Sequence, residues 1–194
     1  MDLAAFLGGL HADAGHYEVA AALLEPALDQ IEDPAKRADV CRTLGDVYLH
    51  TGDRDKAVAT WQRLVDLAPD DPFAYEELAA VYEENLMWAE AIAVRKQLVE
   101  RNAANPYLQC RSWRDIGADY ERLDQPADAI ASYERALDLA SPGNWLYDDV
   151  KDRLVGVYDR RGDLEGLLAY LDAQVGSGEA DLAIHELKAS VLQR

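Results

Sequence analysis

Residues 41–69 read CRTLGDVYLHTGDRDKAVATWQRLVDLAP, and this stretch decides the fold. Its apolar residues between Cys41 and Tyr48 recur at three- and four-residue spacing, which places them on one face of a helix. A break at Gly52 follows, and a second helical pattern then runs on until Pro69. The stretch therefore predicts two helices that pack against each other across a short turn.

The same pattern returns along the whole chain. A bulky aliphatic residue marks each return, at spacings of 37, 34, 38 and 38 residues: Leu7, Leu44, Leu78, Ile116 and Leu154. A period of this size is typical of an α-solenoid, in which each unit buries its apolar face by stacking on its neighbours. The spacing predicts five units, at 1–37, 38–71, 72–109, 110–147 and 148–178.

Each unit resembles a tetratricopeptide repeat, whose pattern is a large residue, Leu-Gly, Tyr, Ala, an aromatic residue and a closing Pro. The unit at 38–71 shows all of these, in the order Cys41, Leu44, Gly45, Tyr48, Ala57, Trp61 and Pro69. The unit from 110 repeats them as Trp113, Ile116, Gly117, Tyr120, Ala129 and Tyr133. The unit from 72 departs from the pattern, because Arg95 stands where the aromatic residue is expected.

This resemblance covers nearly the whole chain and implies the fold class. We expect an all-α protein, an α-solenoid of tandem antiparallel helix pairs wound into a right-handed superhelix over residues 1–178. Residues 179–194 carry apolar side chains on one side only, which predicts a C-terminal capping helix for the open end of the array.

Local signals predict where the helices begin and how long they are. Asp71-Pro72 and Asn105-Pro106 each look like an N-cap residue followed by Pro in the first turn. Three units carry three or four extra residues just before their first helix, at 34–37, 106–109 and 144–147, so those helices should be about one turn longer. Pro26 lies inside a predicted helix and should kink or interrupt it.

The composition limits the classes of partner. The formal net charge is −18, from 19 Lys and Arg against 37 Asp and Glu, and the acidic residues are spread along the chain. Such a surface repels phosphate backbones and attracts basic groups, so we expect no nucleic acid among the partners. No apolar run approaches the roughly 20 residues that cross a bilayer, so we expect no membrane partner.

The sequence offers no enzyme chemistry and no cofactor. It has no phosphate-binding Gly loop, no paired-cysteine zinc spacing and no nucleophile elbow, so we expect neither catalytic residues nor a metal. A metal reading of His11, Asp13 and His16 is disfavoured by their spacing. The cysteines Cys41 and Cys110 are expected to be thiols packed in first helices, which fits a reducing compartment and a cytoplasmic location.

The family resemblance implies that a ligand lies along the inner groove made by the first helices. The residues at the groove-facing positions are Asp39, Arg42, Asp46, Phe73, Glu76, Ala80, Glu83, Arg111, Arg114, Ala118, Glu121, Asp149, Asp152 and Gly156. They include a row of small residues, an acidic row that contains Glu83 and Glu121, and a basic spot made by Arg111 and Arg114 beside Phe73. For any single charge the alternative is a solvated helix face.

These positions predict a non-catalytic scaffold that binds a protein or peptide segment, expected to be basic, in the concave groove. Two alternatives stay open: a structural module that associates with itself, and a sensor array belonging to a larger protein with a catalytic domain elsewhere. Family members that grip the C-terminal tails of heat-shock chaperones use Lys and Asn. The matching places here include Asp46, Glu77 and Asp115, which would repel an acidic tail.

Overall fold

The computed structural model describes residues 3–174, 185, 188 and 189. Over these residues it contains ten α-helices and no strand, as the period predicts. The chain divides into two compact units, unit 1 from Met1 to Leu98 and unit 2 from Val99 to Arg194. Residues 179–194, predicted as a capping helix, lie outside the described residues apart from 185, 188 and 189.

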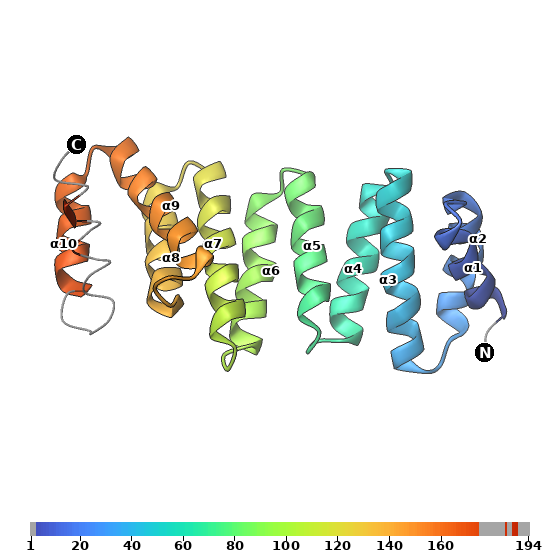
Figure 1. The fold of residues 1–194 in the computed structure, drawn as a ribbon. Coiled ribbons are helices and arrows are strands. Elements are labelled where there is room, and N and C mark those ends of the chain that lie inside the picture. The colour runs from blue at the N-terminus through green and yellow to red at the C-terminus, as the bar shows by residue number, and fades with distance from the viewer. Residues whose placement is uncertain (1–2, 175–184, 186–187, 190–194) are drawn as a thin grey trace. The chain divides into compact units, whose positions relative to one another are not determined.

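Unit 1 is built from successive helices that pack each on the next, with α1 on α2, α2 on α3, α3 on α4 and α4 on α5. The helices are α1 (Leu3–Asp13), α2 (Tyr17–Gln30), α3 (Pro34–Thr51), α4 (Arg54–Leu67), α5 (Pro72–Glu84) and α6 (Trp88–Arg101). Neighbours run antiparallel because only two to four residues connect them (Figure 1). The odd-numbered helices are the first helices of the predicted pairs.

Unit 2 repeats the arrangement, with α7 packed on α8, α8 on α9 and α9 on α10. Its helices are α7 (Pro106–Arg122), α8 (Pro126–Leu139), α9 (Trp145–Arg161) and α10 (Leu164–Gln174). Its core is formed by all four helices and includes Cys110, Tyr133, Leu154 and Leu167. The predicted right-handed superhelix and the boundaries between repeats stay predictions.

The predicted N-caps are confirmed, and they explain where the first helices start. The carboxylate of Asp71 accepts a hydrogen bond from the Phe73 amide, 3.1 Å away, and Asn105 accepts one from Leu108. The predicted longer helices are also confirmed. The three helices preceded by extra residues have 18, 17 and 17 residues, whereas α1 and α5 have 11 and 13.

Small residues let the two helices of a pair approach closely. A Cβ atom on Gly45 would lie 2.6 Å from the ring of Trp61, and one on Gly117 would lie 2.5 Å from the ring of Tyr133. The sequence predicts this close approach, and Trp61 is fully buried as a core residue. In the pair α5–α6, the residue corresponding to these glycines is Ala79, and a flexible Arg stands in the aromatic slot.

The turns within pairs need one residue with a positive φ. Gly52 and Gly162 supply it in two pairs, as their sequence positions predict, with φ angles of 75° and 66°. Where glycine is missing, Leu86 and Asp124 take the same backbone region, at 60° and 56°. Helix α2 continues through Pro26, so it is not interrupted there.

Candidate functional site

The fourteen predicted groove residues all lie on first helices, and none of them is buried. Seven belong to α3 and α5 of unit 1, and seven belong to α7 and α9 of unit 2. Four are exposed, namely Asp39, Asp46, Phe73 and Asp152, and the other ten are half-buried. We describe the face made by α3 and α5 and the face made by α7 and α9 separately.

One ion pair is common to both faces. An Arg stands two residues before the repeat-marking aliphatic residue in α3 and in α7, as Arg42 and Arg114. Arg42 reaches Asp71, the N-cap residue of α5, at 2.8 Å, and Arg114 reaches Asp149 of α9 at 3.3 Å, so each ties its helix to the next first helix. The guanidinium carbon of Arg42 lies 5.8 Å from the centroid of the Phe73 ring.

Within the predicted basic spot, Arg114 is balanced by acids, because it pairs with Asp115 at 2.8 Å in addition to Asp149. Phe73 belongs to unit 1, where Arg42 lies against it, whereas Arg111 and Arg114 belong to unit 2. The placement of Arg111 and Arg114 beside Phe73 stays a prediction.

The predicted acidic row interacts inside the fold. Glu83 pairs with Arg95 at 2.5 Å, and the Arg95 side chain is only 10% exposed. Glu121 accepts a hydrogen bond from the Tyr133 hydroxyl at 2.5 Å and pairs with Arg160. Each of these carboxylates interacts with the residue at the aromatic position of its own helix pair. Reversing their charge would therefore destabilise the fold as well as weaken the binding of any ligand.

Two other acids on the α3–α5 face remain without an ion pair among the described residues: Asp46 and Glu77. Burial raises the pKa of Asp46, and His50 and Arg42 only partly oppose the rise. Burial likewise raises the pKa of Glu77, and the negative charges of Asp46, Glu76 and Glu84 add to it. Both carboxylates would gain free energy from a cation placed beside them.

The corresponding positions on the α7–α9 face are neutralised. Counted from the repeat-marking residues, Asp46 corresponds to Ala118 and Glu77 corresponds to Arg153. Arg153 donates from Nε to Asp149 at 3.0 Å, which joins it to the Arg114 pair. Among the described residues, this face therefore has no counterpart of the Asp46–Glu77 pair.

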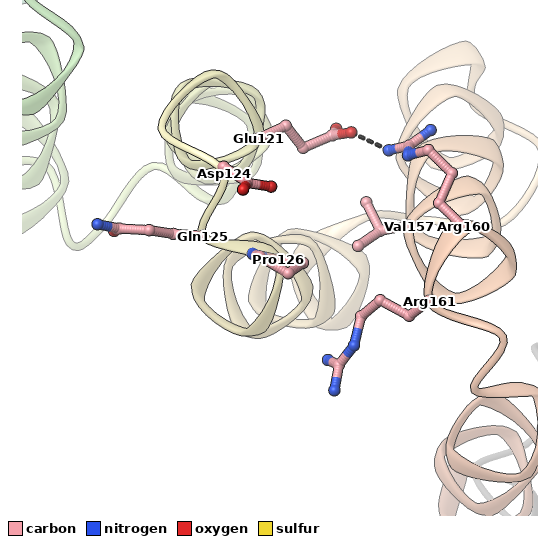
Figure 2. Close-up of a pocket in the computed structure, with 7 residues that line it drawn as sticks. All are labelled: Glu121, Asp124, Gln125, Pro126, Val157, Arg160 and Arg161. Carbon is pink, nitrogen blue, oxygen red and sulfur yellow. Dashed lines mark hydrogen bonds and ion pairs between the residues drawn. The ribbon is translucent and has the colours of Figure 1, made fainter.

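Figure 2 shows a pocket at one end of the α7–α9 face, where the turn between α7 and α8 meets the end of α9. Glu121 and Arg160 form an ion pair across it, and Arg161 lies 4.0 Å from Asp163. Three residues near this pocket and the two faces are not among the predicted groove residues: Glu77, Arg153 and Arg160. Glu77 is named above only as a position where other family members bind chaperone tails. The two arginines differ from the residues at the same repeat positions in the other units, so the repeat pattern does not mark them.

The described residues contain no group of three His, Cys, Asp or Glu side chains that could hold a metal ion. His11 and His16 do approach each other, with their Nδ1 atoms 3.3 Å apart. Cys41 and Cys110 are free, buried thiols, and burial raises the pKa of Cys110 to about 11. None of the helices in the described part of the chain is long and apolar enough to span a membrane.

Comparisons with known proteins agree with the repeat pattern of the sequence. A family model described as tetratricopeptide repeat matches residues 11–82. Photosystem I assembly protein Ycf3 of Rippkaea orientalis is 28% identical over 123 residues, which are 56% of this chain and 70% of that protein. Tetratricopeptide repeat protein 21B of Mus musculus is 22% identical over 188 residues, or 95% of this chain, but the chain spans only 13% of its length.

Solved structures show the same fold. MamA from Desulfovibrio magneticus RS-1 is 20% identical with a TM-score of 0.60, and the match covers 100% of this chain and 96% of that one. The first TPR of Spaghetti (RPAP3), bound to the HSP90 peptide SRMEEVD, is 23% identical with a TM-score of 0.51, over 64% of this chain and 93% of that one. The repeat pattern, the helix pairs and these matches together support a tetratricopeptide repeat protein.

Proposed function

We propose that this protein is a non-catalytic interaction module that binds a protein segment carrying Lys or Arg on the first-helix faces. Members of this fold generally act as scaffolds for protein partners. The observation that carries the proposal is the unneutralised carboxylate pair of Asp46 and Glu77 on the α3–α5 face. We therefore propose that this pair anchors the basic group of the partner.

The net charge of the whole chain also supports a basic partner. A net charge of −18 attracts a basic segment from a distance and speeds its encounter with the protein. Close to the surface, the Arg42 guanidinium lies 5.8 Å from the centroid of the Phe73 ring and pairs with Asp71, the N-cap residue of α5. A Lys or Arg side chain can lay its apolar stem on Phe73, which is 40% exposed, while its charge meets Glu77 or Asp46.

The test measures the binding of a fluorescent amphipathic peptide of Leu and Lys by anisotropy. The variant Asp46→Asn with Glu77→Gln keeps the side-chain shapes, and it should weaken binding by roughly tenfold. The control variant Asp55→Asn with Glu90→Gln removes the same charge from exposed positions on the second helices of unit 1, and it should weaken binding much less.

Two peptides complete the experiment. The same peptide with Glu in place of Lys, and the acidic peptide SRMEEVD that the Spaghetti (RPAP3) domain binds, should both fail to bind. Equal losses in the two double variants would mean that only the total charge attracts the peptide. Tight binding of SRMEEVD would overturn the proposal of a basic partner.

One relative that is much longer than this chain suggests a second candidate function. The match covers only 13% of mouse Tetratricopeptide repeat protein 21B, so repeats like these also occur inside much longer proteins. We propose as the alternative that the chain serves as the sensor part of a larger protein with a catalytic domain. Sequencing the gene on both sides of this stretch would test this alternative. A reading frame that encodes no further domain would contradict it.

A further inference from the structure

The pocket of Figure 2 is a small cavity inside unit 2 whose two walls carry opposite charges. Glu121 and Asp124 stand on the wall made by α7 and the turn after it, and Arg160 and Arg161 stand on the wall made by α9. The cavity has a volume of about 190 Å³. This is below the roughly 300 Å³ at which pockets for drug-sized ligands begin, so the cavity fits a guest of few atoms.

One pair of opposite charges already spans the cavity. Glu121 pairs with Arg160 through its Oε2 atom, and its Oε1 atom accepts a hydrogen bond from the Tyr133 hydroxyl at 2.5 Å. Both carboxylate oxygens of Glu121 therefore have partners within the fold. A cationic group that enters the cavity finds an open carboxylate at Asp124 instead.

The second pair of opposite charges, Asp124 and Arg161, is left open. Among the described residues, the Asp124 carboxylate has neither an ion pair nor a hydrogen bond. Arg161 approaches Asp163, but 4.0 Å separates the two charged groups, and the Arg161 side chain is 39% exposed. Asp124 and Arg161 thus line one cavity without pairing with each other.

These two charges are not part of the repeat pattern. Asp124 has a φ of 56° and occupies the turn position where Gly52 and Gly162 stand in other pairs. Arg161 occupies the position just before the turn residue, where α3 has Thr51. The open carboxylate and the open guanidinium are therefore a local feature of this cavity, and helix pairing does not require them.

The floor between the walls is apolar. Val157 is 2% exposed and lines the cavity, and Pro126 lies beside it at the start of α8 (Figure 2). A guest that meets both charges can therefore also bury an aliphatic group here.

We propose that this cavity binds a free aliphatic α-amino acid as its zwitterion. The ammonium group pairs with Asp124, the carboxylate pairs with the Arg161 guanidinium, and the side chain lies on Val157 and Pro126. The two acids and two arginines of the lining balance each other, although the chain carries a net charge of −18. A guest with one charge would gain one partner and face like charges on the other wall, whereas a zwitterion complements both walls.

The test is calorimetric titration of the full chain with L-leucine and with two analogues that each lack one charge. At about pH 6, L-leucinamide keeps the protonated α-amino group and lacks the carboxylate, and 4-methylpentanoate keeps the carboxylate and lacks the amine. Leucine should bind with a Kd below about 1 mM, and each analogue should bind at least about tenfold more weakly. Glycine, which lacks the aliphatic group, should also bind more weakly.

Two variants assign each charge of the ligand to its wall. Asp124→Asn should weaken leucine binding about tenfold and leave 4-methylpentanoate binding unchanged, because that analogue has no ammonium group to lose a partner. Arg161→Gln should weaken leucine binding by a similar factor and leave leucinamide binding unchanged. Circular dichroism of each variant checks that it is folded.

The controls remove the same charges from exposed positions outside the cavity. Asp128→Asn on α8 and Arg54→Gln in unit 1 should both bind leucine as the native chain does. A Kd for leucine above about 1 mM, equal affinities for leucine and its two analogues, or equal losses in cavity and control variants would each overturn the proposal. The basic segment proposed above binds at Asp46 and Glu77 in unit 1, so either proposal can fail without the other.

Discussion

The α3–α5 face of unit 1 and the α7–α9 face of unit 2 are built from first helices at the same repeat positions, but their carboxylates are balanced differently. Both hold an Arg that reaches the next first helix or its N-cap, Arg42 to Asp71 and Arg114 to Asp149. Only the α7–α9 face extends this bridge, because Arg153 joins Asp149 as a second cation. The α3–α5 face has Glu77 at that position.

The difference shows that a repeat position decides where a side chain lies, while its neighbours decide whether its charge is available. Asp149 and Glu121 on the α7–α9 face already have cations, so a basic ligand would have to compete with them. On the α3–α5 face, burial raises the pKa of Asp46 and of Glu77, and neighbouring negative charges raise the pKa of Glu77 further, which makes an incoming cation favourable.

The largest expected effect separates two carboxylates at the same repeat position. Glu83→Gln should lower the free energy of unfolding by about 2–3 kcal/mol, because it removes an ion pair with the Arg95 guanidinium, which is only 10% exposed. Glu121→Gln should cost about 0.5–1 kcal/mol, because the Tyr133 hydroxyl can donate to the amide oxygen and the exposed Arg160 stays hydrated. Urea unfolding measures both.

A background variant tests whether the cost of Glu83→Gln depends on Arg95. Changing Ala79 to Gly and Arg95 to Tyr gives α5–α6 the glycine and the tyrosine of α7–α8. In that background, Glu83→Gln should lower the free energy of unfolding only slightly. Equal costs for Glu83→Gln and Glu121→Gln in the native background would contradict the assignment of Glu83 to a buried ion pair.

The next prediction converts one face into the other. Glu77→Arg gives α5 the residue that α9 has at Arg153. The new cation should meet Asp46, raise the melting temperature, and weaken binding of the Leu–Lys peptide more than tenfold, which corresponds to more than about 1.4 kcal/mol. Calorimetry and anisotropy provide the two readouts. Tighter binding of the basic peptide by this variant would rule out the α3–α5 face as its site.

The turns offer a smaller test, because each unit contains turns with a positive-φ glycine, such as Gly52 and Gly162, and one turn without, at Leu86 and at Asp124. Leu86→Gly should stabilise unit 1 by about 1 kcal/mol, since a leucine in the left-handed region is strained. Asp124→Gly should gain less in unit 2, because Asp tolerates this region better. Gly52→Ala is the matched control and should destabilise by a similar amount. Thermal unfolding followed by circular dichroism would detect the order, and a gain at Asp124 above that at Leu86 would contradict it.

The smallest effect is a pH dependence. The folded protein raises the pKa of Asp46 and Glu77, so it holds their protons more strongly than the unfolded chain does. Their contribution to stability is therefore lost as the pH rises through the folded pKa values. The Asp46→Asn, Glu77→Gln variant should be more stable than the native chain at neutral pH, by about 0.2–0.5 kcal/mol, as for other like-charged neighbours. The difference in stability between the variant and the native chain should disappear below the ordinary carboxyl pKa. A difference that grows in acid would mean that these carboxylates stabilise the fold.

Most of the fold could be predicted because its signals are local. The period of Leu44, Leu78 and Ile116 gives the helix pairs, and the caps at Asp71 and Asn105 give the helix starts. The candidate site was predicted only as a set of positions. All fourteen residues lie on first helices, and the structure adds that Glu83 and Glu121 also interact inside the fold, with Arg95 and Tyr133. Their contact with a ligand stays a prediction.

The sequence by itself determined the all-helical repeat, its helix boundaries and its acidic charge, because periodicity, capping and composition act over a few residues at a time. Only the tertiary structure decided which charges are balanced, through pairs such as Arg114 with Asp149, 35 residues apart in the chain. Coulomb interaction depends on the distance between side chains and on their burial, and folding sets both. Glu77 and Arg153 share one repeat position, and their surroundings in the folded chain make one an open carboxylate and the other part of a closed network.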